Sequence, residues 1–86
     1  MDTSYPIVEV MAYFGTDGHV RPHRFRLTND DDQLLVVKVD ELITVEPEWA
    51  GGNEMIVFKC RSVMGGQARE YTLKYEKETC QWLLKM

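Results

Sequence analysis

Hydrophobic and polar residues alternate along most of this 86-residue chain. Alternation directs every second side chain to the same face, which is typical of β-strands and not of helices. No segment combines a helix cap with about ten residues of 3.6-residue periodicity. We therefore predict six strands separated by the turn-rich stretches TDG, TNDDDQ, PEWAGGN, MGG and EKET. The strands are predicted over residues 7–14, 21–27, 34–45, 55–62, 68–75 and 80–85.

Three of the turns predict which residues face each other, because loop length fixes the register of a hairpin. We take Asp17-Gly18 and Gly65-Gly66 as two-residue turns and EKET as a four-residue loop. Each register pairs apolar with apolar residues and opposite charges with each other, as cross-strand stabilisation requires. The predicted pairs are Val10–Phe25, Val8–Leu27, Glu9–Arg26, Ala12–His23, Phe58–Leu73, Ile56–Tyr75, Cys60–Tyr71, Arg61–Glu70, Leu73–Trp82, Tyr71–Leu84, Glu70–Lys85 and Tyr75–Cys80.

These registers define an inward-facing set of side chains and hence a fold. The acids inside VVKVDELITVEP predict a bend near Asp40–Glu41, which lets one long strand serve two sheets or turn a barrel corner. A sheet with one apolar face closes on itself in water. We predict a single all-β domain over residues 1–86, a six-stranded antiparallel meander that closes into a small, partly open SH3-like barrel. The inward set is Val8, Val10, Ala12, Phe25, Leu27, Val37, Val39, Ile56, Phe58, Cys60, Tyr71, Leu73, Tyr75, Trp82 and Leu84.

Several short motifs carry a family resemblance. Gly18-x-Val20-x-Pro22, Phe58-x-Cys60, Tyr71-x-Leu73 and the late Trp82 resemble features of short bacterial proteins with a small SH3-like β-barrel fold, whose functions are uncharacterised. The resemblance spans most of the chain and depends on residues that determine the fold. It implies an architecture and no activity.

Composition narrows the classes of protein. Hydrophobic residues make up 44% and charged residues 28%, as in folded globular domains. The net charge of −4 argues against a general nucleic-acid binder, which usually carries a basic surplus. The start MDTSYPIVEV lacks the features of a signal peptide, and no apolar run reaches the roughly 18 residues of a membrane span. We therefore expect a cytoplasmic protein with reduced thiols.

The two cysteines, Cys60 and Cys80, form no C-x-x-C motif. The predicted registers place them about 16 Å apart, beyond the reach of a disulfide. Both are expected to be small buried hydrophobic residues without a nucleophilic role.

The stretch TDGHVRPHRFRL, residues 16–27, concentrates positive charge in an acidic protein. The register predicts that Arg24 and Arg26 point outward and that His23 points inward, and it leaves Arg21, Arg24 and His19 without an opposite charge. One interpretation is a solvated strand face. The alternative is contact with an anion or a nucleic acid through Arg21, Arg24, Arg26 and His19, since guanidinium groups suit phosphates. Histidines four residues apart share no face across a turn and a strand, so we predict no metal site.

No catalytic or cofactor-binding constellation is recognisable. The aspartates at 30–32 are contiguous and lack the alternation of a calcium loop, so a solvated turn explains them. The glycine pairs at 51–52 and 65–66 are turn residues and precede no helix. We expect a protein that is not an enzyme and that uses no cofactor.

Several apolar residues fall on outward positions: Ile7, Met11, Tyr13, Val36, Leu42 and Leu83, with Trp49 in a predicted loop. Scattered exposed apolar residues are normal, whereas a contiguous patch indicates a protein interface. The candidate interface residues are Ile7, Met11, Tyr13, Trp49 and Leu83.

Two functions therefore remain open. The preferred hypothesis is a protein-interaction or self-associating β-barrel module, with a homodimer or another protein as its partner. The alternative is a nucleic-acid-binding accessory domain that uses the basic second strand, with Lys38 alongside.

Overall fold

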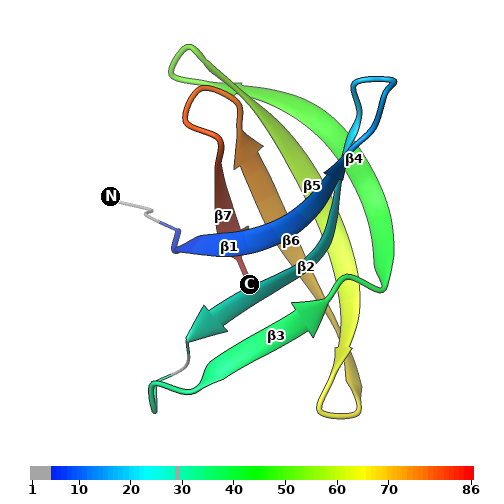
Figure 1. The fold of residues 1–86 in the computed structure, drawn as a ribbon, viewed down its shortest axis with the longest axis vertical. Coiled ribbons are helices and arrows are strands. Elements are labelled where there is room, and N and C mark those ends of the chain that lie inside the picture. Colours follow the sequence, from blue (N-terminus) through cyan, green and yellow to red (C-terminus); the bar gives the residue numbers. More distant parts are fainter. Residues whose placement is uncertain (1–4, 29) are drawn as a thin grey trace.

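A computed structural model of the chain describes residues 5–28 and 30–86. These residues form seven β-strands in one antiparallel sheet. The order of strands across the sheet is β3-β2-β1-β7-β6-β5-β4 (Figure 1). The all-β class is confirmed, but the strand count is seven and not six. The strands are β1 (Ile7–Phe14), β2 (Val20–Thr28), β3 (Leu34–Lys38), β4 (Glu41–Ala50), β5 (Asn53–Met64), β6 (Gln67–Glu76) and β7 (Gln81–Lys85).

The extra strand comes from the predicted bend. Residues 34–45 form two strands, which meet at a corner made by Val39 and Asp40. The position of the bend is confirmed, and it does let the segment serve two parts of the sheet, because β3 pairs with β2 while β4 pairs with β5. The stretch 46–50, predicted as a loop, continues β4 instead. Pro47 is tolerated there because β4 is an edge strand with only one hydrogen-bonded neighbour.

The sheet is rolled into a half-barrel. β3 and β4 follow each other in sequence but lie at opposite ends of the strand order, so the two ends of the sheet must meet at the Val39–Asp40 corner. In Figure 1 the two green strands, β3 and β4, join at this corner and then diverge, and β1 passes across β6 and β7. β1 links the two parts, since Ile7 and Val8 pair with β7 and the following residues pair with β2. The pairing of β1 with β7 was not predicted.

The core fills the inside of this roll. Aromatic rings join the two sides of the roll: the ring centroids of Phe25 and Tyr71 are 5.3 Å apart in the core, and those of Tyr75 and the exposed Phe14 are 5.9 Å apart at its margin. Every residue of the predicted inward set is either buried in the core cluster or packed against it, but His23 and Cys80, also expected inside, are not part of the core. Three further residues pack there, namely Val20, Leu42 and Met64. The prediction that Leu42 points outward is therefore wrong. Val39 and Leu42 both pack against the core although they are three residues apart, so the Val39–Asp40 corner reverses the alternation and leaves Leu42 opposite buried Cys60.

A buried serine links the Val39–Asp40 corner to the rest of the sheet through hydrogen bonds. Ser62 on β5 is fully buried, and its hydroxyl donates to the carbonyl oxygen of Lys38 at 2.6 Å. The hydroxyl of Tyr71 lies 2.5 Å from the same oxygen atom of Ser62. Because a serine hydroxyl carries one proton, Tyr71 is the donor in this second bond. The N–H of Asp40 also donates to the carbonyl of Arg61 at 3.1 Å. These bonds tie β3 to β5 and β6 where the two ends of the sheet meet.

The registers test the turn predictions directly. The β5–β6 register is confirmed, with Phe58 opposite Leu73 and Cys60 opposite Tyr71. Its turn residues Gly65 and Gly66 have φ values of 58° and 81°, as a two-residue primed turn requires.

The β6–β7 register is displaced by two residues from the prediction. Leu73 faces Leu84, and the loop is Lys77–Cys80 in place of EKET. A displacement of two residues keeps each side chain on its predicted face, which is why the core prediction survives this error.

The β1–β2 register is confirmed only in part. Glu9 faces Arg26 and Val10 faces Phe25 as predicted, but Ala12 faces Pro22 and not His23. The loop holds three residues, since Gly15 N–H donates to His19 O at 2.8 Å. A bulge between Met11 and Ala12 compensates for the longer loop by leaving His23 as the extra residue of β2.

Candidate interaction surface

The outer face of β1, β2 and β3 gathers most of the residues singled out in the sequence. Across these strands the pairing gives two rows, Glu9–Arg26–Val36 and Met11–Arg24–Lys38, followed by the pair Tyr13–Arg21. Arginines therefore occupy the central strand, with apolar side chains on both sides. We call this set the outer patch: Glu9, Met11, Tyr13, Arg21, Arg24, Arg26, Val36 and Lys38.

The bulge in β2 assembles the patch. Arg21 and Arg24 are three residues apart, and strict alternation would place them on opposite faces. The extra residue at His23 changes the phase, so Pro22 is buried and Arg21 joins Arg24 on the outer face. His23 does not point into the core as predicted. It is half-buried, and its ring centroid lies 5.4 Å from that of Tyr13. Its Nε2 atom lies 3.4 Å from an Arg24 guanidinium nitrogen.

Apolar side chains are open to solvent in the patch. Met11 is 58% exposed, Tyr13 61% and Val36 60%. A depression of about 530 Å³ lies between β1 and β3, with Met11 and Val36 among its lining residues and Arg24 and Arg26 beside them. This arrangement can bind an apolar group and place a negative charge next to it.

The positive charge of the patch is largely uncompensated. Arg26 forms an ion pair with Glu9, which raises the pKa of Arg26 through a side-chain hydrogen bond. No carboxylate within residues 5–28 and 30–86 lies in ion-pair distance of Arg21, Arg24 or Lys38. The protein has a net charge of −4, so this positive region is a local feature.

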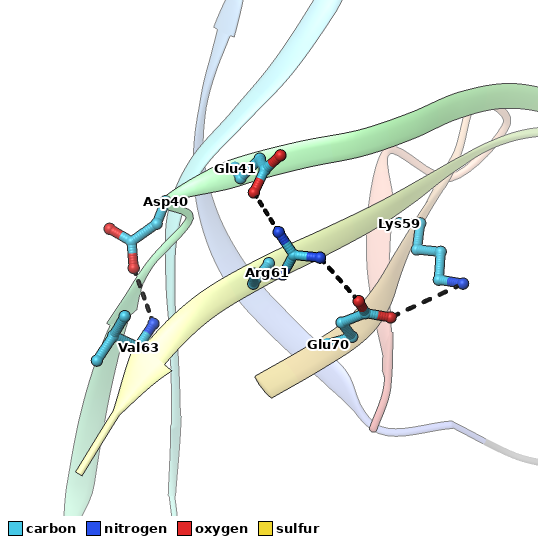
Figure 2. Close-up of polar contacts among 6 residues, drawn as sticks. All are labelled: Asp40, Glu41, Lys59, Arg61, Val63 and Glu70. Atoms are coloured by element: carbon cyan, nitrogen blue, oxygen red, sulfur yellow. Dashed lines mark hydrogen bonds and ion pairs between the residues drawn. The ribbon is translucent and has the colours of Figure 1, made fainter. Parts of the chain in front are cut away.

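At the β4 end of the sheet, by contrast, the arginine is paired with acidic side chains. Arg61 on β5 donates to Glu41 Oε1 at 2.6 Å and to Glu70 Oε2 at 3.0 Å, and Lys59 lies 3.9 Å from Glu70 (Figure 2). Beside this network, the Val63 N–H donates to the Asp40 carboxylate at 2.8 Å (Figure 2). Here opposite charges alternate across β4, β5 and β6, so the surface is electrostatically satisfied.

Some candidate residues lie outside the patch. His19 stays in the β1–β2 turn, where its N–H and its ring Nδ1 both contact the Asp17 carboxylate, at 3.0 and 2.9 Å. The hydrogen bond from His19 lowers the pKa of Asp17. Trp49 is 69% exposed but lies on β4, at the opposite end of the strand order from β3. Leu83 is half-buried and lies opposite Ile7.

Ile7 extends the apolar surface beyond the patch. It is 61% exposed and lines a second depression of about 640 Å³ together with Leu34 of β3. Leu34 is itself 58% exposed and Leu35 is 42% exposed. Neither residue was singled out in the sequence. The run LLVV was the available signal, but a short apolar run is also typical of a buried strand.

The cysteines are both free, and they have different surroundings. Cys60 is fully buried, and burial raises the pKa of its thiol to about 12. Cys80 is exposed, which corrects the prediction that both are buried. The two-residue displacement of the β6–β7 register places it in the loop, where its φ of 60° ends the turn. Among the described residues no three His, Cys, Asp or Glu side chains cluster as metal ligands.

Comparison with protein-family models, curated proteins and solved structures found no match for this chain. In the described part of the chain, no helix is long and apolar enough to span a membrane. The fold and the surface together define the class of this protein as an all-β half-barrel with a mixed basic and apolar patch on its outer face.

Proposed function

We propose that this protein is a non-enzymatic interaction module and that the outer patch binds an acidic, amphipathic segment of a partner protein. The observation that carries the proposal is the depression at Met11 and Val36, bordered by Arg24, which has no carboxylate partner among the described residues. Exposed apolar side chains favour burial against a partner. Arginine at an interface selects carboxylates through its planar array of donors.

The spacing of the strands defines the shape of the partner. β1 and β3 flank β2, and neighbouring strands lie about 4.8 Å apart, so Met11 and Tyr13 on β1 lie about 10 Å from the strand that carries Val36. A helix about 10 Å across can lie along β2 with a carboxylate stripe over the arginines and apolar residues on both sides. Such a segment matches both the charge and the apolar pattern.

The test uses fluorescence anisotropy with three labelled probes. The first is an amphipathic peptide with a Glu stripe flanked by Leu, the second is its counterpart with Lys in place of Glu, and the third is a short single-stranded RNA. We expect the Glu peptide alone to bind, with an affinity that falls as salt rises. Arg24→Glu should abolish this binding, and Met11→Ser should weaken it about tenfold, the loss expected for a buried apolar contact. Failure of the Glu peptide to bind at low salt contradicts the proposal.

A nucleic-acid accessory role is the second candidate. Arg21, Arg24, Arg26 and Lys38 lie on one face, and the Tyr13 ring beside them offers a surface on which a base can stack. In this case the RNA probe binds, its affinity falls steeply with salt, and Arg24→Glu reduces it while Met11→Ser does not. The exposed side chains of Met11 and Val36, which a phosphate backbone would leave unburied, favour the first candidate.

Two further proposals concern class and location. We place the half-barrel with the small SH3-like barrels on the strength of the motifs around Gly18, Phe58, Tyr71 and Trp82. We also assign the protein to the cytoplasm, where the free thiols of Cys60 and Cys80 would stay reduced.

A further inference from the structure

The free edge of β3 has backbone groups available for another strand. β3 is hydrogen-bonded to β2 on one side and ends the strand order on the other. The Val39 N–H donates to His23 O at 2.9 Å. Because backbone groups alternate in an antiparallel ladder, residues 35, 37 and 39 direct their N–H and C=O groups to β2. Leu34, Val36 and Lys38 therefore direct theirs to the free edge.

The carbonyl of Lys38 supports this assignment of backbone groups to the free edge, and it already accepts a hydrogen bond. It accepts the Ser62 hydroxyl from the side away from β2, at 2.6 Å. This leaves Leu34 and Val36 with both backbone groups on the open edge. Their side chains are 58% and 60% exposed, and Leu35 between them is 42% exposed.

β3 lacks the features that usually protect an edge strand. It contains no proline, its pairing with β2 shows no bulge, and its only charge is Lys38 at the end. An apolar edge of this kind is a template for a further strand. We propose that β3 pairs antiparallel with β3 of a second copy of this chain, across a twofold axis at Leu35.

The backbone determines the register. A hydrogen-bonded pair must join two residues whose groups face the open edge. With Leu34 opposite Val36 of the second copy, and the reverse, four hydrogen bonds form and use all the open groups of both residues. A register centred on Val36 would set Leu34 opposite Lys38, whose carbonyl is bound to Ser62. The structure therefore favours the register centred on Leu35.

The side chains match in the same register. Leu35 meets Leu35 of the second copy on the inner side, and Leu34 meets Val36 on the outer side. Lys38 falls across from Asp32 of the second copy, so opposite charges lie at both ends of the interface. The contact is self-complementary, so it closes at two copies. It joins the two sheets edge to edge and places their outer patches next to each other.

Proline substitution at Val36 tests the pairing without breaking the β2–β3 ladder. Because the Val36 N–H faces the open edge, Val36→Pro removes a donor to the second copy and none to β2. The matched control Val36→Thr keeps the N–H and a β-branched side chain. Sedimentation is measured from about 10 μM to about 1 mM, the range expected for a small interface. We expect the wild type to dimerise, Val36→Pro to weaken dimerisation at least tenfold, and Val36→Thr to change it less than threefold.

A second variant covers the case in which Val36→Pro does not fold, which circular dichroism reveals. Leu35→Lys sets two positive charges against each other at the twofold axis and is also expected to give a monomer. A wild type that stays monomeric over the whole range overturns the inference, as does a dimer that survives Leu35→Lys. The Glu-peptide measurement on Arg24→Glu and Met11→Ser is independent of these results. Failure of the dimer and failure of the proposed function are therefore distinguishable.

Discussion

Each end of the sheet is an edge strand, but the two edge strands differ in how well they are protected against pairing with a further strand. β4 and β3 are both edge strands joined by one corner. β4 carries Pro47 in its middle, flanked by Glu46 and Glu48, and its pairing with β5 has a register shift. β3 has the sequence LLVVK and a regular pairing with β2. One edge has several devices that prevent further pairing, and the other has few.

The outer faces next to these edges differ in the same way. Beside β4, Arg61 contacts two carboxylates, Lys74 lies 3.2 Å from Glu48, and Lys77 lies 3.0 Å from Glu54. Beside β3, most positive charges have no such partner among the described residues, and apolar side chains stand between them. The charges beside β4 are paired with opposite charges, whereas most of those beside β3 are not, as the contact that we propose requires.

Pro47 shows how the protection operates. A proline has no N–H, so its position must be one whose backbone does not donate to β5. Val36 holds the equivalent backbone orientation on β3, with its N–H on the open edge. The chain thus places a proline at this kind of position on one edge and a valine on the other.

The largest expected effect on stability comes from removing the Ser62 hydrogen bonds that hold the two ends of the sheet together. Ser62→Ala removes the hydroxyl that binds the Lys38 carbonyl and accepts from Tyr71. Buried polar groups left without a partner cost stability, and we expect a loss of about 2–3 kcal/mol in urea unfolding. Thr79→Ala is the control, since its hydroxyl donates to Glu76 at an exposed position. A Ser62→Ala loss no larger than that of Thr79→Ala would show that the two ends are held together by the core alone.

Removing the protection of β4 tests the comparison from the other side. The triple variant Glu46→Thr, Pro47→Val and Glu48→Thr gives β4 an edge as open as that of β3. A molecule with two open edges can add neighbours at both, so we expect species larger than a dimer, and association at least tenfold stronger than that of the wild type. Light scattering against concentration measures this. The control Glu46→Gln keeps Pro47 and should behave as the wild type does. An unchanged size for the triple variant contradicts the role assigned to Pro47.

Much of the fold was predictable because alternation survives small errors of register. The core prediction holds even in the β6–β7 hairpin, where the loop is displaced, because a shift of two residues changes partners and not faces. The Gly65-Gly66 hairpin is right in every predicted pair, since two glycines at positive φ specify its turn type.

The errors occur where a bulge or the corner changes the phase of the alternation. At His23 an extra residue reverses the alternation, and the Val39–Asp40 corner reverses it before Leu42, so His23 and Leu42 were assigned to the wrong faces. Pro22 in the middle of a strand was a usable signal, because proline within a sheet is confined to edges, strand starts and bulges. The outer patch therefore could be predicted only in part. Its arginines were visible in the sequence, but the phase that puts Arg21 beside Arg24 depends on the bulge.

The closure of the sheet into a roll also could not be predicted from the alternation of hydrophobic and polar residues. Strand order depends on which strands meet over long separations, and no turn signal links β1 to β7. The free edge of β3 follows from this order, so the sequence alone could not indicate it.

A smaller effect on stability is expected at Tyr71, whose hydroxyl donates to that of Ser62. Tyr71→Phe leaves the Ser62 bond to Lys38 in place, so we expect a loss of about 1 kcal/mol at neutral pH. Burial raises the pKa of Tyr71 from 10.0 to about 12. The folded state therefore keeps the proton where the unfolded chain loses it, and stability falls as pH rises from 10 towards 12. Urea unfolding at several pH values should show a shallower alkaline decline for Tyr71→Phe, and an identical decline would contradict the raised pKa.

The smallest effect separates the two arginine environments. Arg61→Ala breaks contacts with Glu41 and Glu70, so we expect a small loss of stability that shrinks in high salt, because exposed ion pairs are screened. Arg24→Ala breaks no ion pair within the described residues, and we expect no loss of stability at low or high salt. Both side chains lie on the outer face of a strand, so the pair is matched. If Arg24→Ala were the more destabilising of the two, its guanidinium would serve the fold, and its availability to an acidic partner would lose its physical basis.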